Sequence, residues 1–196
     1  TSIAVQAICN VAIKPKKHID YEDLAESRVE LDGLNALSAG KPKWWQKNPL
    51  GKREKADYKR FFSIVDKHIV FYSEKSGFYK YFKGAIEYLL ANSDMRIHYV
   101  TNDPNDQIFE IAKEKPRIFP YYIGEQKAIT LMMKMDADVV VATLEDLENY
   151  YIKRSYVRKD IEYVFFFHHM TSTHLVAHAE AFDHYDAIMC AGPHQV

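Results

Sequence analysis

The feature that most constrains the fold is a regular alternation, from Phe61 onward, of short apolar runs with longer stretches of helical periodicity. The apolar runs are rich in β-branched and aromatic residues and cover residues 68–73, 96–101, 118–123, 138–142, 163–167 and 187–190. The stretches between them predict helices over residues 78–92, 105–114, 125–135, 144–151 and 173–184. Repeated βα units of this kind predict an α/β protein.

The apolar runs are nearly continuous, as expected for strands that are buried on both faces of a sheet. We therefore predict a doubly wound, mostly parallel, six-stranded Rossmann-like sheet, with ligands bound at the carboxyl ends of its strands. Pro120 lies inside the third run and removes one backbone donor. That strand is expected at an edge of the sheet or at a bulge.

The first 60 residues differ from the rest, and we interpret residues 1–60 as a helical, basic arm or linker before a domain over residues 61–196. Residues 21–37 have helical spacing, and residues 41–60 hold eight Lys or Arg against two acids. Trp44 and Trp45 lie in this basic run, a pairing that suits an anionic membrane surface or a phosphate polymer. We favour a solvated linker or a packing arm over such a contact, because runs of charged residues commonly lie on the protein surface.

The overall composition narrows the class of protein. A length of 196 residues suits one main domain, and a formal net charge of −1 gives no general preference for nucleic acid. Cys9 and Cys190 have no partner spacing, so we expect a reducing compartment and a cytoplasmic location, with possible attachment to the inner face of the plasma membrane. No apolar run approaches the roughly 20 residues that span a bilayer.

Two strand exits carry candidate site residues. Ser73 and Gly77, at the exit of the first strand, could present amide donors to a phosphate, although we favour a plain capped turn there. The spacing is neither GxGxxG nor a P-loop, so no nucleotide cofactor is expected. The fifth strand ends in His168, whose imidazole suits a general base. The residues that follow it are candidates for binding substrate or phosphate: His169, Thr171, Ser172 and Thr173.

Other histidines and acids near the C-terminus are interpreted as structural. His174 and His178 stand at i and i+4, a spacing that can ligate a metal, but the glutamate of HExxH is absent. We therefore expect no metal site. Residues 183–186 (DHYD) could hold an acid and base pair, and we favour a cap or turn there.

Three segments resemble the CDP-glycerol glycerophosphotransferases, which build teichoic acids and related poly(glycerol phosphate) glycans of the cell envelope. They are DADVVVATLEDL at residues 136–147, YVFFFHHMTSTHL at residues 163–175 and FDHYDAIMCAGPHQV at residues 182–196. The likeness covers residues 67–196 in order and spacing. It implies the N-terminal, acceptor-side domain of a GT-B transferase, with the C-terminal domain that binds CDP-glycerol lying outside this chain.

The resemblance implies that His168 is the catalytic base, because the family's first-domain histidine ends a strand, often as Trp-His-Gly. Here Phe167 and His169 flank His168 instead. The implied reaction moves glycerol phosphate from CDP-glycerol to a hydroxyl of a phosphate-rich or lipid-linked glycan acceptor, without a cofactor, and this chain alone is expected to be inactive. The alternatives are a GT-B glycosyltransferase that uses a nucleotide sugar and a non-catalytic module that binds an anionic polymer or membrane.

Overall fold

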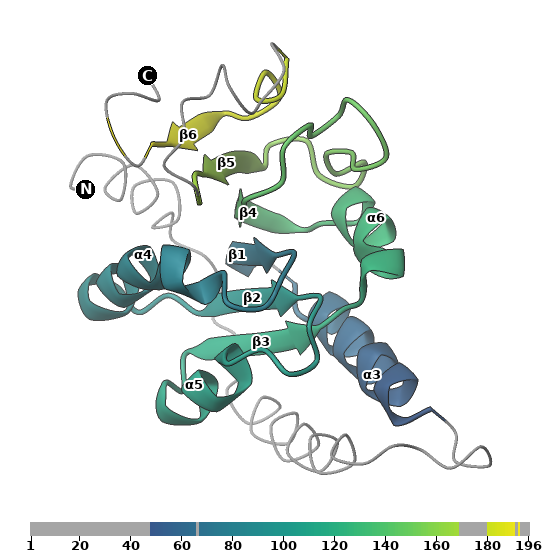
Figure 1. Cartoon of the computed structure of the whole chain (residues 1–196), viewed down its shortest axis with the longest axis vertical. Coiled ribbons are helices and arrows are strands. Elements are labelled where there is room, and N and C mark those ends of the chain that lie inside the picture. Colours follow the sequence, from purple (N-terminus) through teal and green to yellow (C-terminus); the bar gives the residue numbers. More distant parts are fainter. Residues whose placement is uncertain (1–47, 66, 169–179, 191, 193–196) are drawn as a thin grey trace.

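The centre of the protein is a parallel sheet. A computed structural model describes residues 48–65, 67–168, 180–190 and 192. The strands run in the order β3-β2-β1-β4-β5-β6, and every pairing is parallel (Figure 1). Their bounds are β1 Lys67–Ser73, β2 Ile97–Thr101, β3 Ile118–Tyr122, β4 Ala137–Ala142, β5 Glu162–Phe166 and β6 Ala187–Met189. This confirms the predicted doubly wound, six-stranded fold.

The order of the strands reverses between β1 and β4, the two central strands. β1 pairs with β2 on one side and with β4 on the other, so that Ile69 stands between Ile97 and Val139. All residues of β1 except His68 are buried, as are all residues of β2 and β4. Such burial on both faces explains why these runs show no alternation of apolar and polar residues.

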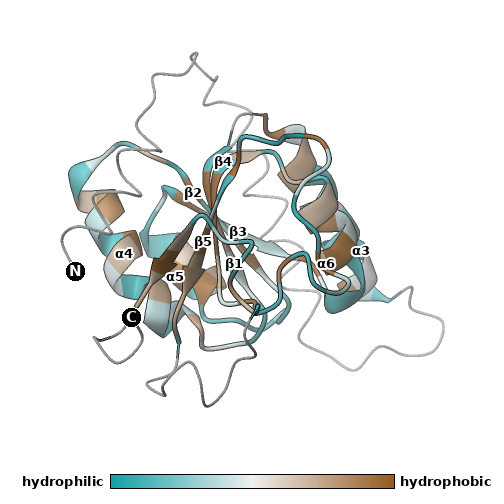
Figure 2. Cartoon of the chain, turned by 90° about the horizontal axis from the view of Figure 1, so that it is seen from above, coloured by the Kyte–Doolittle hydropathy of each residue, from teal (hydrophilic) through white to brown (hydrophobic). Residues whose placement is uncertain are grey.

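Among the described residues, four helices cover the two faces of the sheet. They are α3 (Pro49–Ser63), α4 (Tyr79–Asn92), α5 (Ile108–Glu114) and α6 (Glu125–Met133). Figure 2 shows α4 and α5 on one side of the sheet and α3 and α6 on the other. Each face has its own core: Phe71 packs with Phe82 on the α4 side, whereas Val70 belongs to the cluster of Leu131 on the α6 side. None of the helices among the described residues is long and apolar enough to span a bilayer.

Helix α3 closes the outer edge of β3 with its side chains. Three of them bond to outward-facing backbone groups of alternate residues: Arg60 to the Pro120 carbonyl, Asp57 to the Tyr122 amide at 2.9 Å and Glu54 to the Gly124 amide at 3.0 Å. Each replaces a hydrogen bond that a further strand would have made. The second half of the basic run of residues 41–60 is therefore a helix packed on the sheet.

Pro120 is accommodated because β3 is an edge strand, as predicted. In a strand, the N–H and C=O of one residue point to the same side, and the Pro120 carbonyl points outward to Arg60. The missing Pro120 N–H would also have pointed outward, away from β2. Ile123 lies on the inward side, where its amide donates to the Thr101 carbonyl at 3.0 Å. The proline thus costs the sheet no ladder hydrogen bond.

The predicted helix over residues 144–151 is wrong. This stretch is an irregular connection in which Asp146 and Glu148 have φ of 62° and 72°. Left-handed residues cannot continue a right-handed helix. Leu144 and Leu147 supplied the apparent helical period, and both are buried against the α6 side of the sheet. The predicted helix over residues 173–184 lies mostly outside the described residues, and residues 180–184 form a turn.

Candidate functional site

The candidate site lies at the carboxyl ends of β1, β4 and β5, where the strand order reverses. The first contributor is the loop after β1. Ser73 is fully buried, and its hydroxyl donates to the Lys75 carbonyl at 2.8 Å. Gly77 has a φ of +83°, which favours glycine, and an added Cβ would meet no atom within 4 Å. In this structure the Ser73 hydroxyl makes a hydrogen bond within the loop, and Gly77 adopts the left-handed backbone conformation at its turn.

His168, just beyond the end of β5, contacts the segment that follows β1. Its half-buried side chain lies against two aromatic rings at the start of α4: Phe78, at 5.0 Å between ring centroids and 33° between planes, and Tyr81, at 5.8 Å and 63°. Phe166, two residues earlier, packs on Phe82 of the same helix at 5.5 Å. The structure therefore joins His168 to the loop that holds Ser73 and Gly77.

The remaining predicted site residues lie outside the described part of the chain: His169, Thr171, Ser172 and Thr173. His174 and His178 lie outside it as well. Among the described residues, no group of three or more His, Cys, Asp or Glu side chains could hold a metal ion.

Carboxylates that sequence reasoning missed surround the loop after β1. Burial raises the pKa of the Glu74 carboxyl; Lys75 lowers it, and the negative charges of Glu145 and Glu125 raise it further. Glu74 follows β1 and Glu145 follows β4, and so they meet where the strand order reverses. Their negative charges oppose the binding of an anion beside these strand ends. The sequence alone does not indicate that these carboxylates lie close together, because their proximity depends on the order of the strands in the sheet.

Thr143, directly after β4, is the second feature that sequence reasoning missed. It is 1% exposed, and its Oγ1 has no hydrogen-bond partner among the described residues. Buried hydroxyls in folded proteins are nearly always hydrogen-bonded. Nothing in the sequence distinguishes this threonine from others, since the lack of a partner is visible only in three dimensions.

The segment of residues 183–186 has the structural role that we favoured. The Asp186 carboxylate accepts from the Tyr163 amide at 2.8 Å and forms a bidentate pair with Arg154, at 2.8 and 3.2 Å. The Tyr185 hydroxyl donates to the Leu144 carbonyl at 2.5 Å, and burial raises the pKa of that hydroxyl. These contacts fasten the connection before β6 to the sheet.

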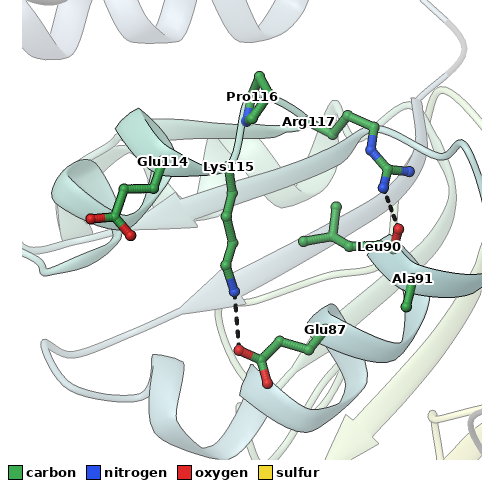
Figure 3. A pocket seen from close by; sticks show the side chains of 7 residues that line it. All are labelled: Glu87, Leu90, Ala91, Glu114, Lys115, Pro116 and Arg117. Atoms are coloured by element: carbon green, nitrogen blue, oxygen red, sulfur yellow. Dashed lines mark hydrogen bonds and ion pairs between the residues drawn. The ribbon is translucent and has the colours of Figure 1, made fainter.

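A pocket of 460 Å³ lies at the opposite, amino edge of the sheet, between the end of α4 and the connection from α5 to β3 (Figure 3). Three of its charged side chains already have partners in the protein. Lys115 pairs with Glu87 at 3.0 Å, and Arg117 donates to the carbonyls of Leu90 and Ser93 at the end of α4. The pocket is far from the strand ends where ligands of doubly wound sheets bind, so it does not belong to the candidate site.

Comparison with known proteins gives no identity for this site: no family model, no curated protein and no solved structure matches the chain.

Proposed function

We propose that this chain is the acceptor-side domain of a transferase that moves glycerol phosphate from CDP-glycerol to a hydroxyl of a glycan or poly(glycerol phosphate) acceptor. The sequence resemblance suggests the donor and the acceptor. The observation that carries the proposal is the position of His168 at the carboxyl end of β5, beside the β1 exit, in a sheet of order 3-2-1-4-5-6. Doubly wound sheets of this order bind ligands at that edge, near the reversal of strand order.

In the proposed reaction, the oxygen of the acceptor hydroxyl attacks the phosphorus that carries the glycerol of CDP-glycerol. A new P–O bond forms, the P–O bond to CMP breaks, and CMP leaves with the bonding electron pair. The hydroxyl proton goes to the imidazole of His168. An imidazole suits this step because its ordinary pKa is close to neutral pH, so that it can accept a proton and release it again.

The packing of His168 supports a catalytic role. Phe78 and Tyr81 lie against its ring from one helix and restrict the ring's orientation. A base that is already oriented loses less entropy when it takes the proton. Because its side chain is half-buried rather than enclosed, part of it is accessible from outside the protein.

Substitution of His168 in the intact protein, including its donor domain, tests the proposal with radiolabelled CDP-glycerol. His168→Ala should lower turnover by about 100- to 10,000-fold, the range for losing general-base assistance, with a smaller effect on acceptor affinity. The sequence resemblance selects His168 rather than its neighbour, so His169→Ala is the matched control and should be much milder. The role of His168 is refuted if His169→Ala is the more damaging change, or if both variants keep full turnover.

Donor specificity is tested in the same assay. Turnover with a UDP-sugar and none with CDP-glycerol would assign a nucleotide-sugar glycosyltransferase of the same architecture. Full turnover of the intact protein after His168→Ala would instead indicate that this chain is a binding module and does not supply the catalytic base. Polymer extension by residues 1–196 alone would contradict the proposal that the active site needs a second domain.

A further inference from the structure

Three neighbouring strands of the sheet end in a buried hydroxyl. Ser73 at the end of β1 pairs in register with Thr101 at the end of β2. On the other side, Thr143 directly follows Ala142, the register partner of Tyr72, and therefore stands level with Ser73. All three side chains are at most 1% exposed. The row crosses the point between β1 and β4 at which the strand order reverses.

The three hydroxyls differ in their hydrogen bonds. Thr101 Oγ1 donates to Asp106 Oδ2 at 2.8 Å, and Ser73 Oγ donates to the Lys75 carbonyl at 2.8 Å. Within the described part of the chain, Thr143 Oγ1 has no partner. An unpaired buried hydroxyl destabilises the folded state, because its hydrogen bonds to water are lost and not replaced. A hydrogen-bond partner from a bound ligand would explain why a hydroxyl is present at this buried position.

Register places Thr143 on the same face of the sheet as His168. Ala142 pairs with Phe165, so that Thr143 stands level with Phe166. Phe166 contacts Phe82 of α4, and residues level with each other on adjacent strands point to the same face. His168, two residues beyond Phe166, lies against the start of the same helix. Thr143 is therefore between the β1 exit and the proposed base.

We infer that Thr143 Oγ1 hydrogen-bonds the acceptor, contacting a hydroxyl of a polyol at the point where the strand order reverses. The identity of the acceptor as a polyol rests on the proposed function. A neutral polyol is favoured over a phosphate group because the carboxylates of Glu74 and Glu145 follow the same two strands, and their charges oppose an anion. A threonine hydroxyl can donate to a polyol oxygen and accept from another.

Thermal unfolding of the 196-residue chain tests whether the Thr143 hydroxyl lacks a protein partner. Thr143→Val keeps the shape and removes the hydroxyl, so the midpoint should rise by about 2 to 4 °C. Thr101→Val is the matched control: it removes a hydroxyl that is bonded to Asp106 and should lower the midpoint. A fall in the Thr143→Val variant as large as that in the control would overturn the inference.

Binding is tested by NMR titration of the chain with labelled threonine methyl groups. Glycerol, a neutral polyol, should shift the Thr143 methyl resonance, and inorganic phosphate should not. A shift with inorganic phosphate as large as that with glycerol would indicate an anion site, and no shift with either probe would contradict a polyol site; both results would overturn the inference.

In the intact protein, Thr143→Val should lower turnover with CDP-glycerol by about 10-fold, the loss of one hydrogen bond, while Thr143→Ser should retain it. The two proposals can fail separately. If the intact protein does not use CDP-glycerol but the midpoint and the methyl resonance behave as expected, the proposed function is wrong and the hydroxyl site stands. Full turnover of Thr143→Val would overturn the site even if CDP-glycerol is the donor.

Discussion

Replacing Asp57 by Ala tests the attachment of α3 to the sheet. The Asp57 side chain is almost fully buried, accepts from the Tyr122 amide at 2.9 Å and pairs with Arg60 at 2.9 Å and with Arg53 at 3.9 Å. Arg53 is 1% exposed, so the substitution leaves a buried guanidinium without its counter-charge. Removing one partner of a buried ion pair costs about 3 to 5 kcal/mol of unfolding free energy. For a chain of this size, the thermal midpoint should fall by about 6 to 20 °C.

The assay is urea denaturation, with Glu110→Ala as the matched control. Glu110 pairs with Lys113 at 3.0 Å, but both side chains are more than half exposed, at 75% and 53%. Loss of that pair should cost below about 0.5 kcal/mol. Amide exchange adds a local measurement: in Asp57→Ala the Tyr122 amide should lose protection, while the Ile123 amide, bonded to the Thr101 carbonyl, keeps it. A stability loss below about 1 kcal/mol for Asp57→Ala would refute the reasoning.

Three further substitutions have expected outcomes that denaturant titration can measure. Gly77→Ala should cost about 1 to 2 kcal/mol from its φ of +83° alone, and an unchanged midpoint would contradict this. Gly84→Ala, in the exposed middle of α4 with open space around it, should instead stabilise by about 0.5 to 1 kcal/mol, and a loss would argue against the described packing. Burial, followed by the charge of Lys67, holds the pKa of His98 well below its usual value, so folded His98 stays neutral while the unfolded chain takes up a proton. Stability should therefore fall below pH about 6.5 by up to about 1.4 kcal/mol per pH unit, and His98→Gln should remove that slope; equal slopes would show that His98 is not the cause.

The strands could be predicted because burial on both faces leaves an unmistakable apolar run. The run from Val139 to Val141 is an example: all three residues are at most 1% exposed, and no other element type explains so short a run as simply. Pro120 likewise indicated an edge strand because its effect on hydrogen bonding is local.

The errors arose where distant contacts decide the local structure. Leu144 and Leu147 have helical spacing, but the backbone turns left-handed at Asp146 and Glu148, and the Asp146 amide donates to the Ala181 carbonyl at 3.0 Å. The same limit applies to the candidate site. The position of His168 just beyond β5 could be predicted from the apolar run that precedes it, whereas the unpaired hydroxyl of Thr143 is visible only once the strands are assembled.

The bonds from α3 to β3 also affect which molecules can associate with the protein. The bonding side chains are three residues apart on the helix, a rise of about 4.5 Å, whereas their partners are two residues apart along the strand, a distance of about 6.6 Å. Three side chains of the same length could therefore not all reach their partners. Arg60, Asp57 and Glu54 differ in length and reach backbone groups at Pro120, Tyr122 and Gly124. An incoming strand from a second molecule would have to displace the whole helix, with its buried charges, before it could pair with β3. The helix therefore protects the β3 edge of the sheet against edge-to-edge pairing, and its detachment would expose that edge.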